Sequence, residues 1–133
     1  MFRAIFLTLI VLVPLASWAD DGIKCNKDGN QLELNACAND NFVKADKELN
    51  ETYQALIKKE ADDPLFVSKL RLAQKAWLTF RDADLDALFA CSEADIKICW
   101  GSMYPMLYFN RKAELTRERI KHLQRILKEG RGE

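Results

Sequence analysis

The sequence is poor in the residue types that most enzyme active sites need. It contains one histidine, His122, and five glycines spread along the chain. These glycines form no phosphate-binding loop, and no GxSxG motif positions a serine nucleophile. Nucleophilic catalysis, which requires a nucleophile beside a base, is therefore not indicated.

Carboxylates are plentiful, but they are not arranged as a catalytic pair. Asp82, Asp84 and Asp86 alternate along one expected helix. Because a helix turns about 100° per residue, this spacing points the three side chains in different directions. A glycosidase-type pair of facing carboxylates is not predicted, and we expect neither an enzyme nor a bound cofactor.

The sequence also lacks strand-like alternation, internal repeats and an apolar run long enough to cross a membrane. A positively charged start is followed by the almost wholly apolar residues 4–16, and the small residues Ser17 and Ala19 occupy the positions that a signal peptidase reads. The run is shorter than the roughly 20 residues that span a bilayer, and no basic cluster follows it. These features predict a cleaved signal peptide over residues 1–19, with no stable membrane anchor, and a single periplasmic or secreted domain over residues 20–133.

Neither sign of charge dominates, since the chain has 20 basic and 20 acidic residues, but the charges are unevenly placed. Residues 20–63 hold 11 acidic and 6 basic residues, whereas residues 100–133 hold 4 and 8. We favour the interpretation that the two ends complement each other within the fold; the alternative is an acidic surface for a basic partner. Export and the lack of interleaved aromatic residues argue against nucleic acid as a partner of the basic stripe on the last expected helix, which comprises Arg117, Lys121, Arg125 and Lys128.

Four cysteines follow the predicted cleavage site, and an exported protein meets an oxidising compartment. Three pairings are formally available. We predict Cys25–Cys37 and Cys91–Cys99, because each pair closes a short segment rich in polar and turn residues. A zinc site is the weaker alternative, since spacings of 12 and 8 are not those of paired CxxC ligands; no metal site is predicted.

Apolar residues recur at helical steps in three stretches, which predicts an all-α fold. The expected helices span residues 39–62, 64–90 and about 103–128. Asn39 and Asp63 are the expected N-caps of the first two helices, which should lie antiparallel because only a tight connection separates them. The fold class predicted is an antiparallel three-helix bundle with an irregular N-terminal arm, residues 20–31, held by the first disulfide.

The central helix carries the clearest apolar period and is expected to be covered by the other two. Its predicted inward stripe comprises Phe66, Leu70, Ala73, Trp77 and Phe80. The last helix is expected to present Phe109, Ala113, Thr116, Ile120, Leu123 and Leu127.

Polar residues lie beside these apolar stripes and form the candidate site. One row on the first helix comprises Asp46, Asn50 and Tyr53; a second row on the central helix comprises Gln74, Trp77 and Arg81. If the rows face each other, Arg81 needs a carboxylate, which Asp46 or Asp82 can supply. A hydrogen-bond network that fixes helix register is the favoured interpretation, and the floor of a recognition groove is the alternative.

Three motifs at these residues occur in a recognisable order: C…NxC ending at Cys37, DxxLNxxY from Asp46 to Tyr53, and QxxWxxFRD from Gln74 to Asp82. In this pattern the chain resembles the LprI-type lysozyme-inhibitor family of exported bacterial proteins. Gly101-Ser102 and the run Leu115-Thr116-Arg117-Glu118-Arg119 resemble its later part. The chain departs from the family in its third and fourth cysteines: Leu85 and Asn110 or a neighbour stand where members often have them.

The resemblance implies an exported helical protein that binds and blocks lysozyme, protecting peptidoglycan from a host or competing muramidase. Animal lysozymes are strongly basic, so an acidic helix hairpin would be steered toward one. The segments expected to enter the lysozyme cleft are the arm Asp20–Asp28 and the Cys91–Cys99 loop. The alternative function is a non-catalytic periplasmic structural or adaptor module that binds an envelope protein; a weaker one is immunity against a delivered toxin.

Overall fold

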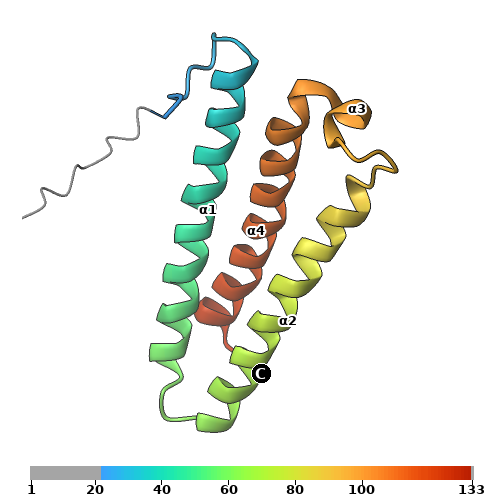
Figure 1. Cartoon of the computed structure of the whole chain (residues 1–133). Helices are drawn as coiled ribbons and strands as arrows, with labels where there is room; N and C mark the ends of the chain where they lie inside the picture. Colours follow the sequence, from blue (N-terminus) through green and yellow to red (C-terminus); the bar gives the residue numbers. More distant parts are fainter. Residues whose placement is uncertain (1–21, 133) are drawn as a thin grey trace, which may run out of the picture.

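The computed structural model describes residues 22–132 and confirms the predicted all-α class, with no strand in that range. Three long helices run up, down and up: α1 (Gln31–Lys59), α2 (Pro64–Leu88) and α4 (Tyr104–Glu129). A short helix α3 (Ile96–Trp100) and a 3-10 turn η1 (Gly101–Met103) connect the second and third long helices (Figure 1). The predicted signal peptide lies outside the described residues.

Helix α1 begins earlier than predicted, and the expected cap Asn39 lies in its interior. The actual N-cap is Asn30, whose side chain accepts from the backbone N–H groups of Leu32 and Glu33 at 2.9 and 3.2 Å. The Glu33 carboxylate in turn accepts from the Asn30 N–H at 2.8 Å, which completes a capping box. Residues 31–38, which precede the predicted start, are therefore part of the first long helix.

Helix α2 begins as predicted, with Asp63 Oδ1 accepting from the Phe66 N–H at 2.9 Å and Pro64 in the first turn. Its inward face is rotated relative to the predicted stripe. Leu70 is buried and Phe66 and Trp77 are half-buried, but Ala73 is exposed and Phe80 is 63% exposed. The residues buried beside the stripe are Gln74, Arg81 and Leu85. Two of these are polar and find partners on other helices, so apolarity alone pointed to the wrong edge of the helix.

Helix α1 packs most closely against α4, which runs parallel to it, while α2 runs antiparallel to both. The predicted antiparallel relation of α1 and α2 is thus present, but α4 is the nearest neighbour of α1. Figure 1 shows the three long helices side by side and the α1–α2 connection at the end opposite α3. The core of the bundle contains Leu49, Leu56, Leu70, Ile120 and Leu123, with Tyr53, Ile57, Phe66, Trp77, Ile126 and Leu127 packed against it.

Helix α4 presents the predicted face. Ala113, Thr116, Ile120 and Leu123 are buried, and Phe109 and Leu127 are half-buried. The helix ends at Gly130, whose φ of +80° is a conformation that glycine adopts without strain.

The chain end is attached to the connection between α1 and α2. Lys59 Nζ donates to the carbonyl of Leu127 at 2.7 Å, and Arg131 Nη1 donates to Asp63 Oδ2 at 2.9 Å. Arg131 also lies 3.8 Å from the Glu60 carboxylate and over the ring of Phe66, 4.6 Å from its centre. These contacts close the end of the bundle opposite the disulfides. No helix of the described chain is both long and apolar enough to cross a membrane.

Candidate functional site

The polar residues predicted from the motifs form a network centred on Arg81, a side chain that is only 6% exposed. Its Nε donates to Asp82 Oδ1 at 2.9 Å, and its Nη1 lies 3.9 Å from Asp46 Oδ1 on α1. Both carboxylates proposed from the sequence as partners of Arg81 are therefore beside it. Because Asp46 and Asp82 are partly exposed, each keeps contact with water while the guanidinium is covered.

Helix α4 contributes two cations that were not among the predicted site residues, although Arg119 lies in the Leu115–Arg119 run noted above. Lys112 Nζ lies 3.5 Å from Asp82 Oδ1, and Arg119 Nε donates to Gln74 Oε1 at 3.0 Å. Both residues flank the predicted apolar face of α4 at a spacing of seven, which was the available signal. Gln74 thus pairs with α4, not with the α1 row it was expected to face.

Aromatic rings enclose the cations of this network. The Arg81 guanidinium lies 5.2 Å from the Trp77 ring centre and 5.7 Å from that of Phe42. Lys112 Nζ lies 5.0 Å from the centre of Phe42, and the Arg119 guanidinium 5.9 Å from that of Trp77. Contacts of this kind stabilise a desolvated cation by about 0.5–2 kcal/mol.

The network shifts the titration of two of its members. Partial burial alone would raise the pKa of Asp82, but the hydrogen bond and charge of Arg81, with the charge of Lys112, bring it below its ordinary 3.8. Burial lowers the pKa of Arg119 below its usual value. The remaining predicted members lie at the edge of the network. Asn50 Nδ2 donates to Asp46 Oδ2 at 3.3 Å, and Tyr53 packs against the core.

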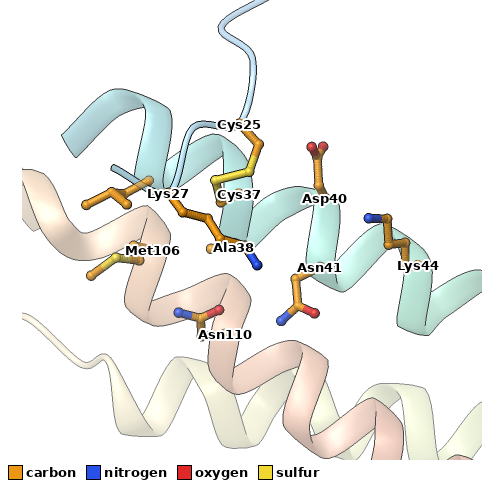
Figure 2. A pocket seen from close by; sticks show the side chains of 10 residues that line it. Cys25, Lys27, Cys37, Ala38, Asp40, Asn41, Lys44, Met106 and Asn110 are labelled. Atoms are coloured by element: carbon orange, nitrogen blue, oxygen red, sulfur yellow. A yellow bond between two sulfur atoms is a disulfide. The ribbon is translucent and has the colours of Figure 1, made fainter. Parts of the chain in front are cut away.

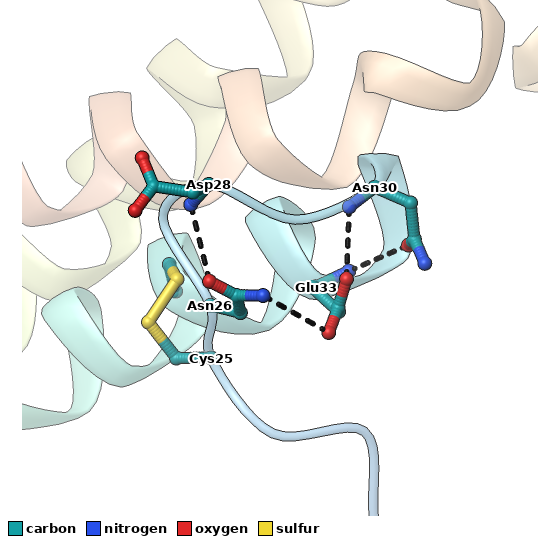
Figure 3. The surroundings of a disulfide bond; sticks show 6 residues. Cys25, Asn26, Asp28, Asn30 and Glu33 are labelled. Carbon is teal, nitrogen blue, oxygen red and sulfur yellow. Dashed lines mark hydrogen bonds between the residues drawn. A yellow bond between two sulfur atoms is a disulfide. The ribbon is translucent and has the colours of Figure 1, made fainter.

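The N-terminal arm is fixed by the predicted Cys25–Cys37 disulfide, which ties it to α1. Asn26 bridges the turn, accepting from the Asp28 N–H at 3.1 Å and donating to Glu33 Oε1 at 3.5 Å (Figure 3). A Cβ at Gly29 would displace the Glu33 carboxylate from its place in the capping box. The arm is therefore held in one conformation by the disulfide and these hydrogen bonds, although residues 22–28 are exposed.

A shallow groove of about 440 Å³ lies between this arm, α1 and α4 (Figure 2). Its lining residues are Cys25, Lys27, Leu34, Cys37, Ala38, Asp40, Asn41, Lys44, Met106 and Asn110. The Asn41 side-chain oxygen accepts from Arg117 Nη2, which leaves its amide N–H groups for the groove. The sequence analysis did not predict this groove, because its α4 wall comes from residues about 60 positions after the arm and α1.

The second predicted disulfide, Cys91–Cys99, closes the connection between α2 and α4. Within it Asp95 accepts from the Lys97 N–H at 2.9 Å and so caps α3, a helix that was not predicted. Glu93, Asp95 and Lys97 are exposed. An aromatic cluster lies next to this loop. The ring centre of Phe89 is 5.1 Å from that of Trp100 and 5.7 Å from that of Tyr104.

The two disulfide-tied segments lie at the same end of the bundle (Figure 1). Asn35 Nδ2, two residues before Cys37, donates to the carbonyl of Ser102 at 3.1 Å, which joins the start of α1 to η1. We refer to residues 22–30 and 91–100 together as the disulfide end. Its elements converge although they are about 65 residues apart in the sequence.

Other candidates raised by the sequence do not assemble into a site. His122 is exposed, and slight burial together with Arg119 and Arg125 lowers its pKa. Lys121, Arg125 and Lys128 are exposed at the outer side of α4. Within residues 22–132, no three histidine, cysteine or acidic side chains are grouped as a metal site would require.

Comparison with known proteins gives a family match over most of the chain. Residues 24–123 match the family model described as lysozyme inhibitor LprI. An uncharacterized protein of Rhizobium meliloti is 36% identical over 114 residues, which cover 77% of this chain and 78% of that protein. No solved structure matches the chain significantly.

Proposed function

The chain belongs to the LprI lysozyme-inhibitor family, and on this premise we propose that it is an exported, non-catalytic protein that binds and inhibits a lysozyme. The predicted signal peptide over residues 1–19 supports export, and the two disulfides suit a periplasmic or extracellular location.

The observation that carries this proposal is the convergence of two disulfide-tied segments at one end of the bundle. A loop that is already ordered loses little conformational entropy when it enters a cleft, so more of the contact energy remains as affinity. Rigid loops on a helical support are the arrangement expected of an inhibitor that acts by obstruction.

Within the disulfide end, the Cys91–Cys99 loop is the better candidate for contact with a basic enzyme. It exposes two acidic residues, Glu93 and Asp95, against one basic residue, Lys97, whereas the described part of the arm carries Lys24 and Lys27 besides Asp28. Acidic groups on an exposed loop accelerate association with a basic protein and make the rate depend on salt. Asp95 also caps α3, so changing it would disturb the loop. Glu93 is therefore the better residue for a test of the loop's charge.

We propose a different role for the Arg81 network. Its central guanidinium is covered by Trp77 and Phe42 and holds α2 against α1 and α4. Asp46, Asn50, Tyr53, Gln74, Trp77, Arg81 and Asp82 would then fix the register of the helices that carry the disulfide end, and would not touch the lysozyme.

The experiment is a turbidity assay of lysozyme acting on bacterial cell walls, with the purified chain lacking residues 1–19. A micromolar excess should slow lysis, and Glu93→Lys should weaken inhibition most at low salt. Glu129→Lys is the matched control, because Glu129 is an exposed acid near the opposite end of the bundle. If the unaltered protein leaves the lysis rate unchanged at micromolar excess, the inhibitor proposal fails and an adaptor that binds an envelope protein becomes the better description.

A further inference from the structure

The outer face of α2 carries an apolar stripe that the bundle does not cover. Leu65, Leu72 and Phe80 are 68%, 61% and 63% exposed, and the small residues Ala76 and Ala83 lie between and beyond them on the same side of the helix. One charged residue, Lys69, interrupts the stripe between Leu65 and Leu72. Helix α2 lies at the outside of the bundle in Figure 1 and meets α1 and α4 with its opposite face. Exposed large side chains along one helix face usually mark a contact with another molecule.

Charges on one flank of this stripe indicate what that molecule is. Arg71 and Lys75 lie toward the start of α2, and Asp82 and Asp86 toward its end. Their spacings of four, seven and four place all four on one side of the helix. The flank is thus basic in its first half and acidic in its second.

An antiparallel copy of the same helix would complement this flank. When two identical helices pack antiparallel about a two-fold axis, each flank lies beside the same flank of the partner, with the chain direction reversed. The pairs Lys75–Asp82 and Arg71–Asp86 share one midpoint, between residues 78 and 79. A single register therefore places Lys75 beside the partner's Asp82 and Arg71 beside the partner's Asp86, twice each.

The apolar residues suit the same register. With the midpoint between residues 78 and 79, Phe80 packs beside the partner's Ala76 and the partner's Phe80. Leu72 then faces the region of the partner's Ala83. Large side chains thus meet small ones, which lets the helices approach. Asp82 is available to a partner because its contacts with Arg81 and Lys112 both use Oδ1 and its side chain is 52% exposed.

We propose that the protein forms a two-fold symmetric dimer through the outer face of α2. Both charge pairs have the same midpoint, so one antiparallel register satisfies them together. This self-complementarity favours a second copy of the chain over any other occupant of this face. The proposal rests on the residues of α2 alone and does not depend on lysozyme inhibition.

Sedimentation equilibrium of the purified chain lacking residues 1–19 tests the dimer. The protein should sediment at twice its monomer mass at about 100 µM, and Leu72→Ser with Phe80→Ser should shift it to monomer. The far-UV circular dichroism and melting of the double variant, measured at low concentration, should match those of the original protein. Val43→Ser is the matched control, since Val43 is 55% exposed on α1.

Charge reversal tests the register in a way that a folding defect cannot imitate. Arg71→Glu and Asp86→Arg should each weaken self-association about tenfold or more, because each places like charges together twice in the dimer. An equimolar mixture of the two variants should recover the dimer, since both contacts in the mixed species join opposite charges. Lys58→Glu on α1 should have no effect.

Three results would overturn the proposal. One is that the protein is still a monomer at about 100 µM, a concentration above the dissociation constants of most specific complexes. Another is a mixture of the two charge variants that stays as weak as either alone. The third is that the original protein is a monomer and the Leu72→Ser, Phe80→Ser variant no longer inhibits lysozyme. The outer face of α2 would then be the surface that binds lysozyme.

Discussion

Arg81 stacks on Trp77, one turn earlier on the same helix, with the guanidinium carbon 5.2 Å from the ring centre. Its Nη1 is buried, lacks a hydrogen-bond partner in the described chain and lies 3.9 Å from Asp46. The side chain therefore contributes through packing and ring contact as much as through ion pairs. This balance predicts how substitutions at the site behave.

Arg81→Ala should lower the free energy of unfolding by about 2–3 kcal/mol, because it removes a buried stem and its ring contacts. Arg81→Met keeps most of the volume and should cost about 1 kcal/mol, since the two carboxylates left behind are partly exposed and can be hydrated. Urea unfolding of both variants measures the difference. Equal losses in the two would show that the charge matters more than the packing.

Acid should weaken the contact of Asp82 with Arg81 and Lys112. The pKa of Asp82 is lowered in the folded protein from the 3.8 that it has in an unfolded chain, so its contribution is complete above about pH 4 and disappears as pH falls through the folded pKa. Asp82→Asn should cost at most about 1 kcal/mol at pH 7, given the exposure of the side chain. The difference from the original protein should vanish once the pH lies below the folded pKa of Asp82. Asp63 has a lowered pKa too, so only the difference between the two proteins reports on Asp82.

The position of the α1 cap can be tested with two asparagines. Asn30→Ala should destabilise the protein by about 1 kcal/mol, because two backbone N–H groups lose their acceptor. Asn39→Ala lies within the helix and should change stability by no more than about 0.5 kcal/mol. Thermal unfolding followed by circular dichroism compares them. The reverse order would place the start of the helix near residue 39.

Removing the Cys91–Cys99 disulfide should reduce both the stability of the protein and its inhibition of lysozyme, but to different extents. Replacing both cysteines by serine should cost about 2–3 kcal/mol on the loop-entropy account, and should weaken lysozyme inhibition further than that loss of stability explains. The Cys25, Cys37 double serine variant is the comparison. Non-reducing peptide mapping checks the pairing itself, and a link from Cys25 to Cys91 or Cys99 would contradict the structure.

The sequence predicted the helices and the disulfide pairing well because both depend on local pattern. The expected cap Asp63 gave the correct start of α2, and the predicted end of the last helix at residue 128 lies within one residue of the end of α4. The cap of α1 was missed because Asn30 lies in a segment without apolar period, where the Glu33 partner three residues later was the available signal.

The orientation of α2 could not be predicted in the same way. Phe80 was predicted to face the core and is 63% exposed, whereas its neighbour Arg81 is buried. The orientation depends on partners from other helices: Asp46 on α1 lies beside Arg81, and Lys112 on α4, 30 residues after Asp82, lies beside Asp82. The candidate site was likewise predicted in its α1 and α2 members, while its α4 members required the fold.

The close pairing of α1 with α4 has a consequence for how the protein is made. The first helix to leave the ribosome, or to cross a membrane, buries Leu49 and Leu56 mainly against residues of the last one. Until Ile120 and Leu123 have emerged, the earlier two thirds of the chain have no complete core to collapse onto. Folding should therefore be delayed until translation is almost finished. This timing would suit the export proposed above, because an unfolded chain can pass through a narrow channel.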